Sequence, residues 1–353
     1  MTGHGGNIHK ASQMSGLPLK QILDFSASIN PLGVPKSAAS AIRKSIRLLP
    51  HYPEPFAESL ASRIGEHYGV SAESVICGNG STELIYLLPR VLKSKRVLVT
   101  SPSFSEYERA CKSNQPSVVS CQLLKAENNF DINADAFIGY MKGCNLAFLC
   151  NPNNPTGRLL RKKDVLKIAN AAEESECYLV IDEAFMDFCS DETVIEHVSR
   201  NPYLIVLRSM TKFYALAGLR LGFGVFPIRV AKMIKMQKEP WTVNCIADAV
   251  GRAVLEDTAY QTESLAMMRR EKQYLEAGLT RLGIKYVPSS ANYYLIRMKN
   301  AQEVIHALSK KGILLRDCSN FDGLSETYLR IAVRSRTENR ILLKELSELC
   351  RAS

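Results

Sequence analysis

The sequence predicts an α/β fold, with a mostly parallel sheet covered by helices on both faces and a second, smaller α+β domain. Three observations lead to this prediction. Short apolar runs alternate with amphipathic stretches through the middle of the chain, as in parallel sheets. After Pro240-Trp241 the pattern changes to one long helical stretch followed by shorter strand-like runs. The 353 residues suffice for one large domain and one smaller domain.

The N-terminal part of the chain precedes the predicted sheet. It contains His4-Gly5-Gly6-Asn7, whose glycines suit a flap or a frayed terminus better than a helix or strand. A short amphipathic helix is expected over 37–46. The prolines of His51-Tyr52-Pro53-Glu54-Pro55 then predict a rigid extended loop.

Apolar runs in the middle of the chain predict the strands of the main sheet. They are residues 75–77, 97–100, 146–150, 178–181, 203–207 and 222–226. Helices are expected at 83–92 and at 164–175. A further helix is expected to follow Phe104 and to continue through residue 108. Farther on, helices at 258–282 and 338–350 flank strands at 293–297, 313–316 and 328–333. We therefore predict a large domain over 48–238 and a small domain formed by 1–47 and 239–353.

Composition argues against several classes of protein. Hydrophobic residues make up 46% of the chain, but no apolar run approaches the roughly 18 residues that span a membrane, and no signal-peptide pattern is present. We therefore expect a cytoplasmic protein without membrane contact. The ten cysteines form no CxxC pair and do not cluster with the six histidines, so we expect reduced thiols and no metal site.

The formal charge of +10 has two interpretations. The basic residues occur in short scattered groups that are not interleaved with aromatic residues, so a nucleic-acid partner is not expected. An excess of positive charge also suits a small, phosphorylated, anionic ligand.

Polar or aromatic side chains follow the ends of the predicted strands. Because ligands bind beyond the carboxyl ends of parallel strands, we expect these side chains to meet at one edge of the sheet. They are Gly80, Ser81, Thr82, Phe104, Asn154, Asp182, Ser209, Lys212 and Arg220.

Each of these residues also has a simpler interpretation. Ser81 and Thr82 would bind an anion at a helix start, or would only cap that helix. Asp182 directly follows a buried strand and needs a partner, which could be a protonated ring nitrogen, a salt bridge or a metal ion. Phe104 could stack on a flat ring or belong to the core. Lys212 could be solvated, or could form a Schiff base.

Together the strand-end residues supply a phosphate site, a ring face, a partner for a ring nitrogen and a reactive amine. Pyridoxal 5'-phosphate carries a matching group for each, so the sequence predicts it as the cofactor.

The motifs in their order resemble those of the aspartate-aminotransferase-like, fold type I pyridoxal-phosphate enzymes. They are Asn-Pro-Thr-Gly at 154–157, Asp182-Glu183-Ala184, Ser209-x-x-Lys212 and Arg220. The resemblance covers nearly the whole chain. It implies the fold type I architecture, with a mostly parallel seven-stranded sheet, and a homodimer whose active sites are shared between subunits.

The resemblance also implies roles for single residues. Lys212 would carry the cofactor as a Schiff base, and Asp182 would pair with the ring nitrogen. Asn154 would hydrogen-bond the phenolic oxygen, and Phe104 would stack on the ring. The phosphate would be held by the remaining strand-end residues, and Tyr52 would reach over from the other subunit. The phosphate-binding set is Gly80, Ser81, Thr82, Ser209 and Arg220.

One position departs from the wider family. Many members place a tyrosine three residues after the aspartate, where it also contacts the phenolic oxygen, and this chain has Phe185. Without that donor, we expect the phenolate to be less stabilised and the Schiff base to stay protonated more easily.

Two branches of the family are similar to this chain: threonine-phosphate decarboxylase of cobalamin biosynthesis and histidinol-phosphate aminotransferase. The segments that resemble the decarboxylase branch are His4–Asn7, Asp182–Phe185, Arg208–Tyr214 and Glu239–Asn244. We therefore expect decarboxylation of O-phospho-L-threonine. An aminotransferase, an O-phospho-L-serine decarboxylase and a non-catalytic cofactor-binding regulatory module stay as alternatives.

The expected substrate carries two anionic groups. Arg330 and Arg334 lie two strand periods apart in a predicted strand, so both would lie on one face and could bind the carboxylate and the phosphate. The alternative is a pair of surface charges on an edge strand. By the resemblance, His4, Asn7 and Asn30 would complete the substrate pocket.

Overall fold

The large sheet organises most of this protein. The structure, a computed structural model, describes residues 5–113 and 117–352. Within these residues seven strands form one sheet in the order β2-β8-β7-β6-β5-β3-β4. Only β8 runs antiparallel to its neighbours. The strands are β2 (Val75–Asn79), β3 (Arg96–Thr100), β4 (Ser117–Cys121), β5 (Leu146–Cys150), β6 (Tyr178–Asp182), β7 (Leu204–Ser209) and β8 (Leu221–Val225).

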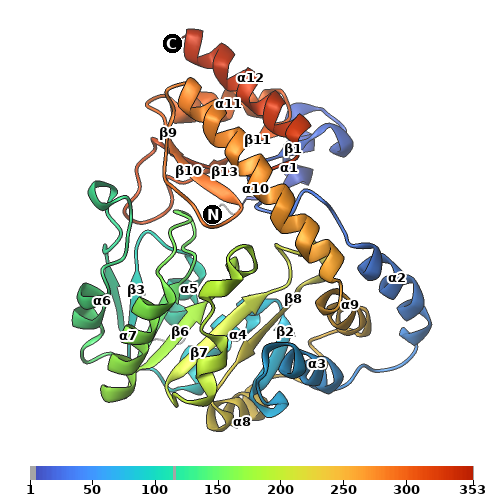
Figure 1. Ribbon diagram of the computed structural model, residues 1–353, viewed down its shortest axis with the longest axis vertical. Coiled ribbons are helices and arrows are strands. Elements are labelled where there is room, and N and C mark those ends of the chain that lie inside the picture. Colours follow the sequence, from blue (N-terminus) through green and yellow to red (C-terminus); the bar gives the residue numbers. More distant parts are fainter. Residues whose placement is uncertain (1–4, 114–116, 353) are drawn as a thin grey trace.

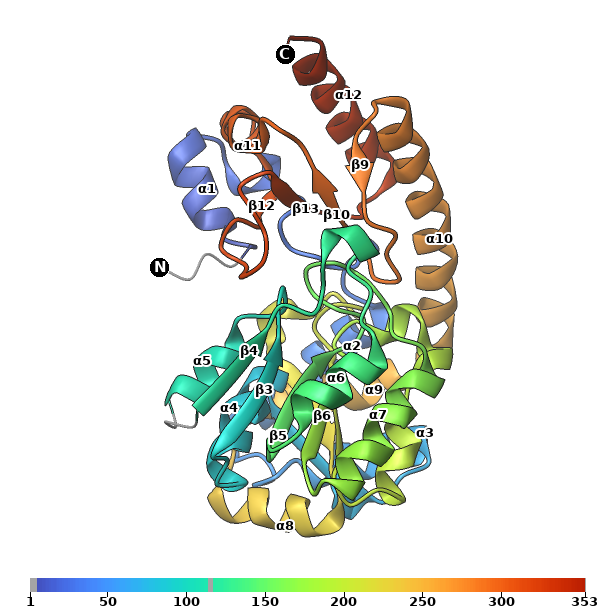
Figure 2. The same ribbon diagram turned by 90° about the vertical axis from the view of Figure 1, so that its left-hand side faces the viewer.

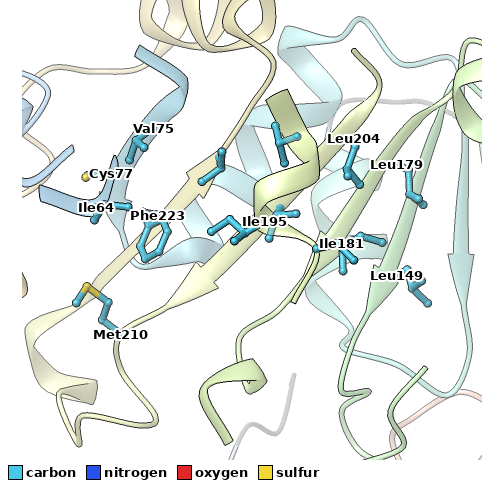
Figure 3. Close-up of a cluster of buried hydrophobic side chains, with 14 of the residues drawn as sticks. Ile64, Val75, Cys77, Leu149, Leu179, Ile181, Ile195, Leu204, Met210 and Phe223 are labelled. Carbon is cyan, nitrogen blue, oxygen red and sulfur yellow. The ribbon is translucent and has the colours of Figure 1, made fainter. Parts of the chain in front are cut away.

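Helices cover both faces of this sheet, as the continuous apolar strands predict (Figure 1). One face packs against α3 (Glu58–Tyr68), α6 (Ala134–Met141), α7 (Lys162–Glu174) and α9 (Cys245–Leu255). The other packs against α4 (Ser81–Val91), α5 (Glu106–Ser113) and α8 (Ile228–Gln237). Successive strand residues point to opposite faces. Leu179 and Ile181 therefore join the first cluster (Figure 3), and Val180 joins the second.

The C-terminal part builds a smaller antiparallel sheet in the order β12-β13-β10-β9. Its strands are β9 (Lys285–Tyr286), β10 (Tyr293–Arg297), β12 (Arg316–Asp317) and β13 (Tyr328–Ala332). The helices around it are α10 (Thr258–Arg281), α11 (Ala301–Lys310) and α12 (Arg336–Ala352). Figure 2 shows this layer lying against one end of the large sheet.

The N-terminal segment lies with this second layer. Its strand β1 (Leu23–Asp24) pairs in parallel with β11 (Ile313–Leu314), and α1 (Ile8–Ser15) lies beside α11 (Figure 2). By contrast, α2 (Lys36–Ser45) packs on α9, and Ala38 belongs to the core of the large sheet. The domain limits at residues 47 and 239 therefore stay predictions.

None of the described helices is long and apolar enough to cross a membrane.

Candidate active site

The structure brings the predicted strand-end residues into one pocket. The pocket lies at the carboxyl edge of the large sheet, where it is closed by residues of the N-terminal segment and of the smaller sheet. From the predicted set it is lined by Gly80, Ser81, Thr82, Phe104, Asn154, Asp182, Ser209, Lys212, Arg220 and Arg330.

Asp182 lies at the end of β6, buried at the floor of the pocket. Burial raises the pKa of its carboxyl to about 6, although hydrogen bonds from Tyr107 and Ala184 oppose the rise. The Tyr107 hydroxyl donates to Oδ2 at 2.7 Å, and the Ala184 N–H donates to Oδ1 at 3.1 Å. A cationic ring N–H would complete this site, because it would offset the cost of burying the charge.

Lys212 follows β7 and lines the same pocket. Burial lowers the pKa of its amine to about 8, and the nearby guanidinium groups of Arg330 and Arg220 contribute to this decrease. Near neutral pH a sizeable fraction of the amine is therefore unprotonated, which is the form that attacks an aldehyde.

A phosphate-sized cradle lies at the start of α4. The first residues of that helix, Ser81 and Thr82, line the pocket with their hydroxyl groups, at the end where the helix dipole favours an anion. Gly80 has a φ of +76°, and a Cβ there would lie 2.6 Å from Nη2 of Arg220. The Ser209 and Thr211 hydroxyls, which are 2.6 Å apart, line the same pocket. Backbone, hydroxyl and guanidinium donors thus converge on one place.

Aromatic and amide side chains line the space between the cradle and Asp182. The ring of Phe104 lies edge-on to Tyr107, and the ring of Phe185 lies edge-on to Tyr293. Both side chains are hydrocarbons, so they give this part of the pocket an apolar surface. Asn154 accepts a hydrogen bond through Oδ1 from Arg330, which connects the large sheet to β13.

Arg316, which was not among the predicted site residues, lies beside Arg330. The two are direct partners in the register of β12 and β13, and both line the pocket. They are only 8% and 7% exposed. Within the described residues no carboxylate forms an ion pair with either of them, and Nε of Arg330 has no hydrogen-bond partner. The signal in the sequence was the arginine that ends the predicted strand 313–316.

Arg334 does not join this pair. The strand β13 ends at Ala332, so the alternation that would place Arg334 on the face of Arg330 does not continue. The guanidinium group of Arg334 instead donates to Glu338 in the first turn of α12, at 2.6 and 3.1 Å.

The predicted N-terminal residues have different positions. His4 lies outside the described residues, but Gly5 lines the pocket, and the Gly6 N–H donates to the Ser26 hydroxyl at 2.8 Å. The Asn7 side chain caps α1 instead of lining the pocket.

Asn30 and Tyr52 do not line the pocket either. The Asn30 backbone N–H donates to the Lys212 carbonyl at 3.0 Å, and its side chain donates to the Phe213 carbonyl at 2.7 Å. Asn30 therefore positions the lysine segment. Tyr52 is 86% exposed on the surface, where its ring centroid lies 5.4 Å from that of Trp241.

The pocket fits pyridoxal 5'-phosphate on the chemistry of its own groups. The cradle suits a phosphate, the buried carboxylate of Asp182 suits a protonated ring nitrogen, and the Lys212 amine suits an aldehyde. Within the described part of the chain no group of three or more His, Cys, Asp or Glu side chains could hold a metal ion.

Comparison with known proteins supports the same cofactor. Residues 20–346 match the family described as aminotransferase class I and II. The chain is 35% identical to threonine-phosphate decarboxylase of Salmonella typhimurium, over 98% of this chain and 96% of that protein. It is 33% identical to histidinol-phosphate aminotransferase of Oleidesulfovibrio alaskensis, over 94% and 88%.

The crystal structure of histidinol-phosphate aminotransferase from Clostridium acetobutylicum superposes with a TM-score of 0.88 at 31% identity, covering 94% of this chain and all of that one. The fold, the cofactor site and the sequence similarity all indicate the same family. The chain belongs to the class I and II aminotransferase family of pyridoxal-phosphate-dependent enzymes.

Proposed function

We propose that this protein decarboxylates O-phospho-L-threonine to (R)-1-amino-2-propanol O-2-phosphate and carbon dioxide, as a step of cobalamin biosynthesis. The similarity to a threonine-phosphate decarboxylase over almost the whole chain supports this choice. The observation that carries it is the pair of Arg316 and Arg330, which line the same pocket as Lys212 and Asp182 and would bind a second anionic group there.

Two like charges directly opposite each other destabilise a strand pair unless an anion lies between them. Both arginines line the pocket, and a guanidinium group can bind phosphate with two parallel hydrogen bonds. We place the substrate phosphate between them. The α-carboxylate would then not be held by these arginines and would be free to leave as carbon dioxide.

Bound pyridoxal phosphate would accept the electron pair of the bond that breaks at the substrate's Cα. Asp182 would hold the proton on the ring nitrogen, which would keep the ring electron-poor. Asn154 would donate to the phenolic oxygen, and Phe104 would support the ring face. As the carboxylate is lost as carbon dioxide, the Lys212 ammonium would give a proton to Cα in its place.

A second candidate is an aminotransferase that acts on histidinol phosphate. The similarity to such enzymes is nearly as high, and the same arginine pair would suit the phosphate of that substrate. In this case the Cα–H bond, not the bond to the carboxylate, would break. O-phospho-L-serine, which lacks only a methyl group, is a third substrate to test.

One experiment separates these reactions. The purified, cofactor-loaded protein is given O-phospho-L-threonine and carbon dioxide is measured; separately it is given histidinol phosphate with 2-oxoglutarate, and glutamate is measured. We expect carbon dioxide without glutamate. Glutamate without carbon dioxide would contradict the proposal. No product with either, or with O-phospho-L-serine, would favour a non-catalytic binding module.

We further propose a homodimer in which Tyr52 completes the partner's site. An exposed apolar patch lies near Tyr52 in the sequence and includes Ile46, Leu48 and Leu49, with Trp241 against the Tyr52 ring. Light scattering after size exclusion tests this: a protein of 39.3 kDa per chain should elute at twice that mass. A cytoplasmic location and the absence of nucleic-acid and membrane partners stay expectations.

A further inference from the structure

Lys238 lies immediately after α8, and its side chain is only 1% exposed. Burying a lysine is costly unless the charge is paired. The ammonium group of Lys238 lies 3.1 Å from Oε1 of Glu83, and it also donates to the Thr242 hydroxyl and to the Glu239 carbonyl. It thus links the segment 238–242, which joins α8 to α9, to a helix 155 residues earlier in the chain.

Glu83 is in the first turn of α4, directly after Ser81 and Thr82 of the phosphate cradle. Its Oε2 accepts the Asn79 N–H at 2.6 Å and the Thr242 hydroxyl at 3.0 Å. These contacts hold the strand end and the helix start in one arrangement. Glu83 is therefore well placed to fix the position of the cradle.

The same carboxylate creates an electrostatic problem. A negative charge one residue from Thr82 repels a phosphate bound at the cradle, while it still gains from the helix dipole. The buried ammonium of Lys238 offsets that repulsion at a distance of 3.1 Å. The geometry and the charge of the cradle thus both depend on one pair, a buried lysine and a partly buried glutamate.

The segment that carries Thr242 also touches the Tyr52 loop. The Trp241 N–H donates to the Pro55 carbonyl at 2.8 Å, and the Trp241 ring lies beside Tyr52. The contacts of Glu83, Lys238 and Thr242 therefore connect the cradle to the surface that we expect to meet a second subunit.

We propose that Glu83, Lys238 and Thr242 form a latch that positions the start of α4 and balances its charge for the cofactor phosphate. Lys238 is a positioning residue: it touches neither cofactor nor substrate and acts through Glu83. The proposal concerns binding of the phosphate group and does not depend on which reaction the enzyme catalyses.

The test compares two probes that differ only in the phosphate. Dissociation constants of pyridoxal phosphate and of pyridoxal are measured by fluorescence on the full chain freed of cofactor. Lys238→Met should raise the dissociation constant of pyridoxal phosphate about tenfold, because it leaves the Glu83 charge uncompensated near the cradle. It should change the dissociation constant of pyridoxal by less than about twofold. The double variant Glu83→Gln with Lys238→Met should recover most of the lost affinity for pyridoxal phosphate.

The surface variant Lys112→Met is the matched control, because it removes an exposed lysine that pairs with Glu108 on the solvent side of α5. It should change neither constant. Equal weakening of both probes by Lys238→Met, or no recovery in the double variant, would overturn the proposal.

Should Lys238→Met not fold, Glu83→Gln takes its place. With the negative charge removed and Lys238 intact, the preference for pyridoxal phosphate over pyridoxal should rise. An unchanged or lower preference would overturn the proposal as well.

Discussion

The Tyr107 hydroxyl donates a hydrogen bond of 2.7 Å to Oδ2 of Asp182, the carboxylate that faces the expected ring nitrogen. Tyr107 is buried, stacked on Phe148 of β5 and edge-on to Phe104, so its position is fixed by packing. Burial raises the pKa of the Asp182 carboxyl, and this hydrogen bond is the largest influence that lowers it. The ionised form of Asp182 therefore depends on Tyr107.

The first prediction is that Tyr107→Phe lowers the turnover number by about tenfold or more, since a hydrogen bond to a charged group contributes about 1.5–3 kcal/mol. Without the donor, Asp182 holds the proton on the ring nitrogen less firmly. Steady-state carbon dioxide release and the visible spectrum of the loaded protein measure the effect. Tyr86→Phe is the control, because it removes a similar 2.7 Å hydrogen bond to Glu106 outside the pocket. Equal losses in both variants would contradict the prediction.

The second prediction concerns the pH at which the cofactor-free protein captures pyridoxal phosphate. The pKa of Lys212 is lowered to about 8, so its neutral, nucleophilic form predominates above that pH and is lost as the pH falls. The capture rate, followed by stopped-flow absorbance, should therefore rise with pH to a midpoint near 8. Arg330→Met removes a nearby positive charge and should move the midpoint upward. A midpoint near the ordinary value of 10.5 in the parent protein would refute the prediction.

The third prediction distinguishes three arginines. Arg316→Met and Arg330→Met should each raise KM for the phosphorylated substrate by about tenfold or more, because each removes charge-assisted hydrogen bonds to an anion. Arg334→Met should leave KM unchanged, since the Arg334 guanidinium is paired with Glu338. Initial-rate kinetics on the three variants check this. Large effects from Arg330→Met and Arg334→Met, with none from Arg316→Met, would instead support the pair predicted from the sequence.

These arginines show how far the sequence could predict the site. Asp182 ends an apolar strand, and Lys212 and Asn154 follow such strands within four residues, so the local pattern places them at one sheet edge. Arg316 becomes a partner of Arg330 only through the pairing of β12 with β13, which joins segments separated by a loop. Arg334 was misplaced because the end of β13 depends on where α12 begins.

Prediction of the fold from the sequence is limited in the same way, because it depends on local apolar patterns. Six strands of the large sheet are continuous apolar runs, and the sequence predicts each of them. The strand β4 is not such a run, because Ser117 and Ser120 interrupt its apolar residues. It lies at the edge of the sheet and pairs only with β3 among the described strands. The surface of β4 is also partly exposed, whereas β2 at the other edge is almost fully buried, so β4 alone lacks the apolar signal.

The fourth prediction concerns Phe185, which lines the pocket edge-on to Tyr293. Phe185→Tyr should add a second donor to the cofactor's phenolic oxygen beside Asn154. Stabilising the phenolate should lower the pH at which the visible absorbance of the loaded protein changes, by about one pH unit. A spectrophotometric pH titration measures the shift. A titration identical to that of the parent would show that the hydroxyl does not reach this oxygen.

The fifth prediction concerns Gly222 of β8, which packs against the start of α4. A Cβ at this position would lie 2.4 Å from the Ser81 nitrogen and 2.9 Å from the Arg208 carbonyl oxygen. Both are backbone atoms, so no side-chain rotation can relieve the overlap, and the strand or the helix start must move. Gly222→Ala should therefore lower the free energy of unfolding by roughly 1–3 kcal/mol.

The same displacement should affect the cradle. The new methyl group would push the backbone nitrogen of Ser81, and Ser81 also lines the phosphate site. Affinity for pyridoxal phosphate should therefore fall together with stability. Gly218→Ala is the matched control, since a Cβ there meets nothing within 4 Å and its φ is not positive. Denaturant unfolding and cofactor titration measure both variants. If Gly222→Ala binds the cofactor as tightly as Gly218→Ala does, then the close approach of β8 does not set the position of the cradle.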